Sequence, residues 1–306
     1  MVVIRFPDGD TSKAEPCAVA LGNFDGVHVG HSALLSTAVR IAKEKKVKSA
    51  VFTFGDHPEA ALGRALTPSI TTTEQKLAIF EAAGIDTVYL CDFVKVKELS
   101  DKEFVSDILQ DKLHAVYAVC GYNFRFGKGG HGDAERLSIL MGGATVLDPV
   151  LVDGEAVSST QIRRAVEKGD LEYAEKMLGR HFFIDLPVIH GKELGRTIGV
   201  PTINQNFPKG HVVPAKGVYA CKVTISGKEY AGVANVGLRP TVEDTGAVNC
   251  ETHIIGLSQE LYGENVKVSF YKKLRDEKKF ATVDDLKKQI AVDIECTKKY
   301  FGANNV

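Results

Sequence analysis

Apolar and polar positions follow two different periods in the first half of the chain. Short apolar runs, typical of buried strands, predict strands over residues 16–21, 47–54, 87–91, 115–120 and 144–152. Between these runs apolar residues recur at helical spacing, which predicts helices over residues 31–45, 73–83, 101–112 and 134–141. Strands and helices that alternate in this way favour βαβ units. We therefore predict an α/β domain built on a parallel sheet.

The pattern changes in the second half of the chain. Helical spacing continues over residues 159–168 and 171–178, and strand-like runs follow at residues 217–225, 228–236, 251–255 and 266–274. Ser226-Gly227 between two of these runs is a signal for a tight hairpin. A last helix over residues 283–300 carries Leu286, Ile290, Val292 and Ile294 on its predicted apolar side. Short antiparallel strands with one terminal helix predict a small β-barrel. We place the domain boundary near residue 184, giving domains 1–184 and 185–306.

Composition adds limits on the partners and the compartment. The chain has 306 residues, which is long for one hydrophobic core, and its net charge of −1 gives no electrostatic case for nucleic acid or a membrane surface. Its 6 cysteines are scattered without a C-x-x-C pair. We see no signal-like N-terminus and no apolar run that could span a bilayer. The cysteines therefore indicate reduced thiols in a cytoplasmic protein, which we expect to be a monomer or a weak oligomer.

Candidate chemistry begins at the turn between the first strand and its helix, residues 20–31. Ligands bind at the carboxyl ends of strands in such sheets, and a helix N-terminus suits phosphate. His28 and His31 are three residues apart, so they share one helix face and can donate to phosphate oxygens. Asp25 can either orient the turn or contact adenosine. The predicted phosphate-binding residues of this turn are Gly22, Asn23, Phe24, Asp25 and Gly30.

Other interpretations of this turn remain open at this point. Many glycine-rich turns between a strand and a helix are purely structural. Two histidines can also ligate a metal, although Zn²⁺ usually takes three or four protein ligands and no further Cys or His follows at finger-like spacing. The spacing differs from G-x-x-x-x-G-K-[ST], which excludes a P-loop.

Two further segments of the first half follow strands. The loop at residues 121–133 combines glycines with aromatic residues, which suits a mobile loop against a flat ligand, or else a flexible loop anchored by phenylalanines. Further on, Ser159 or Thr160 can cap the helix over residues 159–168. The same hydroxyls, with Arg163, can neutralise a polyphosphate. The alternative is a capped helix whose arginines are solvated.

The second half contains a glycine-spaced, basic segment followed by an extended one. Gly191, Gly195, Arg196 and Gly199 have the spacing of a phosphate-cradling loop, although an exposed hairpin has the same pattern. Thr202 and Asn204 are two residues apart, so on an extended chain their oxygens face the same way, as Mg²⁺ ligands would. A Pro-Thr turn with Asn204 bonded to its own backbone is the alternative.

These motifs together resemble the bacterial bifunctional riboflavin kinase/FAD synthetases. G-x-F-D-G-x-H-x-G-H at residues 22–31 and S-S-T-x-I-R at residues 158–163 are similar to the two nucleotidyltransferase signatures, with Arg163 where related enzymes carry a lysine. G-x-N-F-x-F-G at residues 121–127 is similar to the family's FMN-holding segment. G-x-x-x-G-R-x-x-G-x-P-T-x-N at residues 191–204 resembles the riboflavin kinase signature, with Ile203 in place of the usual alanine. The similarity extends from about residue 16 to residue 293.

The resemblance implies a Rossmann-like nucleotidyltransferase domain followed by a β-barrel riboflavin kinase domain with a C-terminal helix. It implies two ATP-dependent steps, phosphorylation of riboflavin to FMN and adenylyl transfer to FMN, which yields FAD and pyrophosphate. Mg²⁺ is the expected cofactor. The implied roles are phosphate contacts for His28 and His31, pyrophosphate for Arg163 and Ser159, flavin for Asn123, Phe124 and Arg275, metal for Thr202 and Asn204, and the base for Glu251. The alternatives are a single-activity protein with one degenerate module and a non-catalytic flavin or nucleotide sensor.

Overall fold

The structure is a computed structural model that describes residues 1–12, 14–55, 67–191, 195, 198–238 and 248–302. The chain forms two compact units, Met1–Ser159 and Thr160–Val306, and each is described by itself. Helices α7 Ser159–Lys168 and α8 Leu171–Leu178, at the start of the second unit, lie before residue 184. The functional boundary at residues 184 and 185 therefore stays a prediction.

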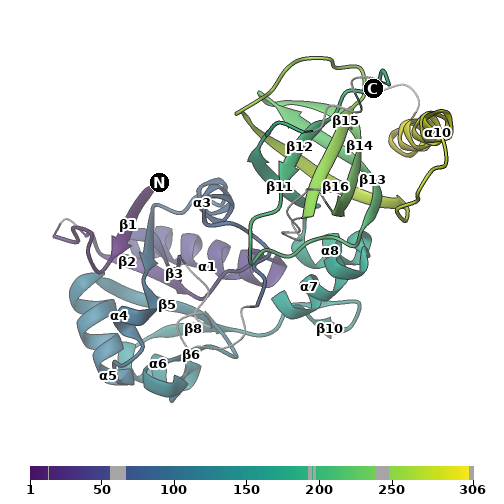
Figure 1. The fold of residues 1–306 in the computed structure, drawn as a ribbon. Helices are drawn as coiled ribbons and strands as arrows, with labels where there is room; N and C mark the ends of the chain where they lie inside the picture. Colours follow the sequence, from purple (N-terminus) through teal and green to yellow (C-terminus); the bar gives the residue numbers. More distant parts are fainter. Residues whose placement is uncertain (13, 56–66, 192–194, 196–197, 239–247, 303–306) are drawn as a thin grey trace. The chain divides into compact units, whose positions relative to one another are not determined.

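The first unit is built on a six-stranded parallel sheet (Figure 1). Its order is β1-β4-β3-β2-β5-β8, and the bounds are β1 Val2–Phe6, β2 Cys17–Leu21, β3 Lys48–Phe54, β4 Thr87–Cys91, β5 Ala115–Gly121 and β8 Ala144–Leu147. Strand β2 is apolar throughout and completely buried, as expected of a central strand covered on both faces. The predicted parallel sheet is confirmed.

Two strands of this sheet differ from the prediction. The apolar run at residues 144–152 ends as a sheet strand at Leu147, because Pro149 cannot continue a ladder. Its remainder forms a small hairpin of β9 Leu151–Val152 and β10 Glu155–Ala156. Strand β1, which the sequence pattern did not predict, lies at the edge of the sheet beside β4.

Helices cover both faces of the sheet. One face packs against α1 Val29–Lys45 and α3 Thr73–Ala82 through a core that includes Leu35 and Phe80. The other face packs against residues of α4 Phe93–Val96, the π-helix η1 Phe104–Lys112 and α6 Ala134–Met141. The short helix α5 Asp101–Glu103 precedes η1, and a capping box of Ser100 and Glu103 begins it. A further 3-10 turn, η2 Lys128–Gly130, lies between β6 Arg125–Phe126 and β7 Gly132–Asp133.

The second unit is a six-stranded antiparallel barrel. Its order is β11-β16-β13-β14-β15-β12, and the bounds are β11 Phe182–Pro187, β12 Ile203–Asn206, β13 Gly217–Ile225, β14 Lys228–Leu238, β15 Val248–Ile254 and β16 Asn265–Arg275. Helices α7 Ser159–Lys168 and α8 Leu171–Leu178 precede it. The barrel nearly closes where the Ile189 N–H donates to the Asn204 carbonyl at 2.8 Å. The predicted barrel with a terminal helix is confirmed.

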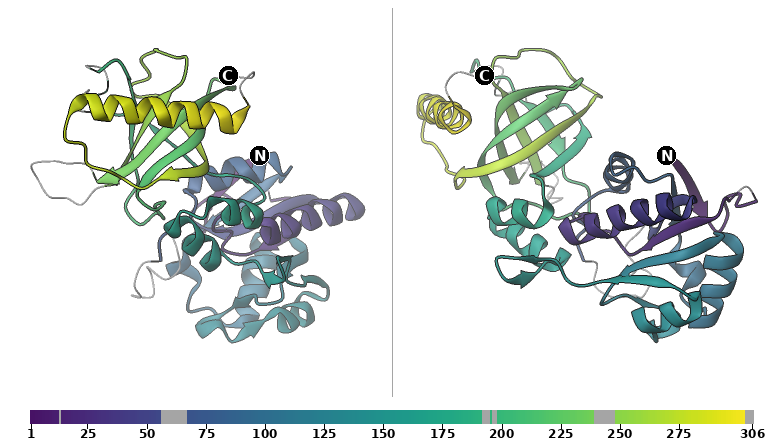
Figure 2. Two further views of the ribbon diagram at one scale, coloured as in Figure 1. Left: turned by 90° about the vertical axis from the view of Figure 1, so that its right-hand side faces the viewer. Right: turned by 180° about the vertical axis from the view of Figure 1, so that it is seen from behind.

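The terminal helix, α10 Val283–Phe301, lies along the outside of the barrel against β13 and β14 (Figure 2). The prediction of its apolar side is wrong at Val292, which is 54% exposed. The side that packs on the barrel follows the helical period through Leu286, Ile290, Asp293 and Thr297, so Val292 falls one residue out of phase. The prediction failed because one buried position on this side of the helix holds an aspartate, Asp293, which a search for apolar residues does not detect.

Two candidate active sites

In the first unit, β2 lies at the point where the strand order reverses. The chain passes from β2 to β3 on one side of it and later enters β5 on the other side. In open parallel sheets, ligands bind at the carboxyl ends of strands at such a switch point. The turn of residues 22–28 follows β2 and the loop of residues 122–124 follows β5, so both predicted segments leave the same edge of the sheet.

The turn after β2 has an unusual backbone. Phe24, Gly26 and Val27 have φ angles of 53°, 78° and 38°, in the left-handed region. The Phe24 ring is completely buried and packs against the rings of Phe80 at 5.5 Å and His31 at 5.1 Å. A Cβ on Gly22 would lie 3.1 Å from that ring. Phe24, predicted to bind phosphate, can therefore offer a ligand only its main chain.

The two histidines lie together at the start of α1. His28 caps the helix, because its Nδ1 accepts from the His31 N–H at 3.2 Å. Their rings stack with centroids 3.6 Å apart, and a Cβ on Gly30 would come within 3.2 Å of the His28 ring. His28 is 7% exposed and His31 is half-buried. Since Nδ1 of His28 accepts, its neutral ring carries the proton on Nε2, which can donate to a phosphate oxygen.

Asp25 ties the turn to two other segments. Its Oδ1 accepts from the Ile70 N–H at 2.9 Å and the Thr71 N–H at 3.3 Å, and its carbonyl accepts from the Ser159 hydroxyl at 2.9 Å. Of the two roles left open for Asp25, these contacts support orientation of the turn. The Ser159 contact also brings the two nucleotidyltransferase-like motifs together. Because α7 begins at Ser159, the position that would cap it is Ser158, one residue before the predicted Ser159 or Thr160.

The remaining residues predicted for the first site differ in how far their side chains are exposed to solvent. Asn123 is exposed in the loop after β5, and Phe124 is half-buried, with its ring stacked on Phe126 at 5.7 Å. Thr160 is exposed, whereas Arg163, one turn along α7, is buried and belongs by its contacts to the second unit.

The barrel unit holds a cavity of roughly 350 Å³. Thr202, Asn204 and Gly191, all predicted, line it together with a wall at residues 257–262. A Cβ on Gly191 would lie 2.4 Å from Nδ2 of Asn204, so this position requires glycine. Gly195 accepts from the Val200 N–H at 2.8 Å, and Gly199 has a φ of 80°. Arg196 lies outside the described residues.

Glu251 is brought next to Asn204 by strand pairing. The two residues lie opposite each other in the β12–β15 register. The side-chain amide of Asn249 donates to Oδ1 of Asn204 at 3.3 Å and to Oε1 of Glu251 at 3.4 Å. Sequence reasoning missed Asn249, although its spacing of two residues from Glu251 in a strand places both on one face. The described part of the barrel thus gathers the predicted metal ligands and the predicted base.

The donor set beside this cavity fits Mg²⁺. The Thr202 hydroxyl and the Asn204 amide oxygen are hard oxygen donors, and the missing Cβ at Gly191 leaves space for the Asn204 side chain. Asn249 fixes the orientation of that amide. Among the residues with described coordinates, no group of three or more His, Cys, Asp or Glu side chains could hold a metal ion.

Comparisons with known proteins agree with both halves. A FAD synthetase family model matches residues 10–161 and a riboflavin kinase model matches residues 178–301. The bifunctional riboflavin kinase/FMN adenylyltransferase of Bacillus subtilis is 37% identical over 292 residues, covering 93% of this chain and 92% of that protein. The protein of the same name from Haemophilus influenzae is 38% identical, covering 99% and 100%. The chain belongs to this bifunctional family.

The resemblance inferred from the motifs is therefore confirmed, and with it the predicted class of enzyme, a riboflavin kinase joined to an FMN adenylyltransferase. A crystal structure from Streptococcus pneumoniae, titled as a macrolide-efflux protein, matches with a TM-score of 0.87 at 30% identity, covering 97% of this chain and 99% of that one. In the part of this flavin-synthesis enzyme that the structure describes, no helix is long and apolar enough to cross a membrane.

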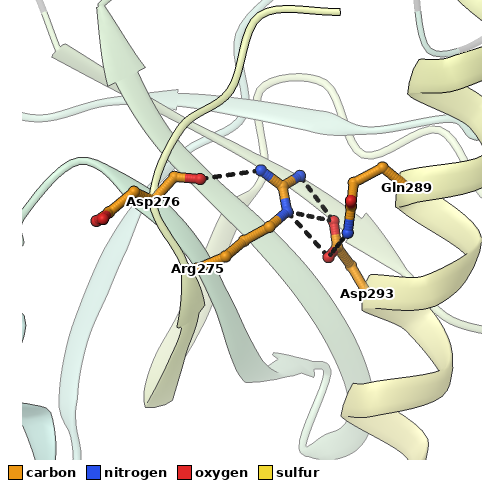
Figure 3. Close-up of polar contacts among 4 residues, drawn as sticks. All are labelled: Arg275, Asp276, Gln289 and Asp293. Atoms are coloured by element: carbon orange, nitrogen blue, oxygen red, sulfur yellow. Dashed lines mark hydrogen bonds and ion pairs between the residues drawn. The ribbon is translucent and has the colours of Figure 1, made fainter.

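Arg275, predicted to contact flavin, is held by α10 at the end of β16 (Figure 3). Its Nε and Nη2 donate to the Asp293 carboxylate at 2.8–3.1 Å, and its Nη1 donates to the Asp276 carbonyl at 3.0 Å. The Gln289 amide donates to the same carboxylate at 3.0 Å. The guanidinium is also 5.8 Å from the centre of the Phe280 ring. These contacts fix the segment between β16 and α10 of the kinase module.

The five buried cysteines are core side chains rather than reactive thiols. All six are free thiols, and five of them are buried. Burial raises the pKa of Cys17 and of Cys250 to about 12. A thiol that stays protonated at neutral pH is a poor nucleophile, so these residues act as small core side chains.

Proposed function

We propose that this chain uses one ATP in its barrel domain to make FMN from riboflavin and a second ATP in its parallel-sheet domain to convert FMN to FAD, with the domain boundary near residue 184. The proposal is supported by two groups of motif residues, one at the carboxyl edge of the parallel sheet and one in the barrel, with Arg163 of the first group lying in the second unit. In the first unit the rings of His28 and His31 stack at the start of α1, and Ser159 donates to the carbonyl of Asp25 in the same turn. In the second unit Asn204 lies opposite Glu251.

In the first site, a phosphate oxygen of FMN attacks the α-phosphorus of ATP and pyrophosphate leaves. The attacking oxygen is already anionic near neutral pH, so no strong base is needed. The protein must align the two phosphates and compensate the charge that develops. We assign the His28 Nε2–H, His31 and the N-terminus of α1 to this task, Ser159 and Arg163 to the pyrophosphate, and Asn123 with Phe124 to the flavin.

In the second site, the nucleophile is the neutral 5′-hydroxyl of riboflavin. Its oxygen forms a bond to the γ-phosphorus, the bond from that phosphorus to ADP breaks, and the hydroxyl proton moves to a base. We assign Glu251 as this base and Asn249 as the residue that orients it. The cavity beside Thr202 would take the ATP. Thr202 and Asn204 would hold Mg²⁺, which compensates phosphate charge when bound.

The remaining expectations concern the setting of the enzyme. Six free thiols fit a reducing compartment, so we infer the cytoplasm. The net charge of −1 fits small-molecule partners, namely riboflavin, FMN and ATP, rather than nucleic acid or a membrane. We propose a monomer or a weak oligomer.

Two variants test the division of labour. Glu251→Gln removes the base at constant shape, so FMN formation should fall by about 100-fold or more while FAD formation from supplied FMN is unchanged. His28→Asn keeps a residue that caps helices but removes the Nε2 donor, so FAD formation should fall by about 100-fold while FMN formation is unchanged. Products are separated by chromatography. Parallel loss of both activities in either variant, with circular dichroism unchanged, would refute the assignment.

A further inference from the structure

The turn that presents the histidines is held in an unfavourable backbone conformation. Val27 is β-branched yet has a φ of 38°, and Phe24 has a φ of 53°. Residues other than glycine adopt this region at an energetic cost and persist there only where the surroundings hold them. His28 follows Val27 directly, so whatever holds the turn also determines where the imidazoles point.

A reciprocal pair of contacts, which we call the Asp25–Thr71 clasp, holds this turn. The Asp25 carboxylate accepts from the backbone N–H groups of Ile70 and Thr71. In return, the Thr71 hydroxyl accepts from the Gly26 N–H at 3.1 Å. Asp25 and Thr71 are 4% and 5% exposed, so water competes little for these bonds. A Cβ on Gly26 would lie 2.9 Å from the Ile70 side chain, which shows how closely the two segments approach.

The segment that carries Thr71 is also hydrogen-bonded to the carboxyl end of strand β3. In the first turn of α3, the Thr73 hydroxyl donates to the Gly55 carbonyl at 3.1 Å and Nζ of Lys76 donates to the Phe54 carbonyl at 2.8 Å. Residues 70–76 therefore join the carboxyl ends of β2 and β3, the edge at which the adenylyl-transfer site is assembled. None of these residues belongs to a motif that pointed to function.

We propose that Thr71 is a positioning residue for adenylyl transfer, acting through Gly26 and the strained turn on His28 and His31. This inference rests on the proposed function of the first unit. Without the hydroxyl, the Gly26 N–H loses its buried acceptor and the turn can relax toward an ordinary backbone. The imidazoles would then stabilise the charge on the phosphates less well in the transition state. Because an interaction made in the transition state affects kcat, kcat should change more than KM.

Steady-state kinetics of FAD formation from FMN tests this. Thr71→Val keeps the shape and removes the acceptor, so kcat should fall by about 5- to 30-fold with KM for ATP and FMN within about 2-fold, whereas Thr71→Ser should stay within about 3-fold of wild type. Far-UV circular dichroism and urea denaturation of the same preparations report whether the first unit, which carries Thr71, is folded, and riboflavin kinase activity, which belongs to the barrel unit, should be unchanged. Thr145→Val is the matched control, because it makes the same substitution in the same unit. It removes a hydroxyl that lies 3.3 Å from the Tyr117 hydroxyl, and it should leave kcat unchanged.

The overturning results are distinct from failure of the proposed function. Thr71→Val equal to wild type, Thr71→Ser as impaired as Thr71→Val, or kinase activity lost in parallel each overturn the positioning role. If the wild-type chain makes no FAD, the proposed function fails, and ¹⁵N spectra of the histidine rings then test the clasp alone. Thr71→Val should shift the His28 and His31 signals and leave His181 in place. Unshifted His28 and His31 signals would overturn the inference.

Discussion

The ion pair between Arg275 and Asp293 gives the sharpest prediction about the stability of the barrel unit. The side chains of Arg275 and Asp293 are 14% and 5% exposed. Asp293→Ala would leave the guanidinium buried with only the Asp276 carbonyl and the Phe280 ring among the contacts seen in the described structure. Removing one partner of a buried pair costs about 3–5 kcal/mol, because the remaining charge is uncompensated. We expect the free energy of unfolding of the barrel unit to fall by about this amount.

The same helix offers a matched control. Lys298 and Glu295 form an ion pair at 3.0 Å with side chains 41% and 71% exposed, so Glu295→Ala should cost less than about 1 kcal/mol. Replacing both buried partners, with Arg275→Met and Asp293→Leu together, removes the unpaired charge. This double variant should recover most of the stability that Asp293→Ala loses.

The assay is urea denaturation monitored by far-UV circular dichroism, because the chain contains no tryptophan whose fluorescence could report unfolding. Two compact units can unfold separately, so the barrel transition is identified by the loss of riboflavin kinase activity at increasing urea. If Asp293→Ala costs no more than Glu295→Ala, or if the double variant is as unstable as Asp293→Ala, the reasoning from the buried pair is wrong.

Two more predictions concern the barrel unit. Gly191→Ala places a Cβ 2.4 Å from the Asn204 amide, so FMN formation should fall by about 100-fold while FAD formation from FMN is retained; equal kinase rates would contradict the role of Asn204. Burial beside the Tyr271 ring lowers the pKa of His181. The Glu175 carboxylate, 3.0 Å away, raises this pKa but does not outweigh burial. Of two more distant charges, Lys222 lowers it and Glu229 raises it. The unfolded chain then binds a proton more readily, so stability is fully present above pH 6.5 and falls as the pH drops below it. Urea midpoints between about pH 5 and pH 8 should show this slope, and His181→Phe should reduce it; an unchanged slope would exclude His181 as its source.

Sequence patterns predicted the central elements of both units well. Strand β2 and helix α1 begin within two residues of their predicted starts, since a fully buried strand and an amphipathic helix leave strong periodic signals. The hairpin at Ser226-Gly227 also forms, with φ angles of 49° and 81° that suit these residues. Strand β1 was missed because an edge strand with both exposed and buried positions has a weak pattern.

The parts that could not be predicted depend on partners distant in sequence. Asp293 looks like a surface residue until Arg275, 18 residues earlier, is seen to bind it. Thr71 has no motif of its own and matters only because it meets Gly26, 45 residues earlier. Asn249 stands between Asn204 and Glu251 only once β12 pairs with β15. Periodicity and local motifs cannot show such pairings.

In the two proposed steps a different phosphorus atom of ATP is attacked, so ATP labelled at a single position distinguishes the steps. The protein is incubated with riboflavin, Mg²⁺ and ATP labelled at either the α- or the γ-phosphorus, and FMN and FAD are separated. We expect FMN to carry label only from γ-labelled ATP, and FAD to carry label from either ATP, because the γ-phosphorus enters with the first ATP and the α-phosphorus with the second. FMN carrying the α-label, or FAD lacking either label, would contradict it.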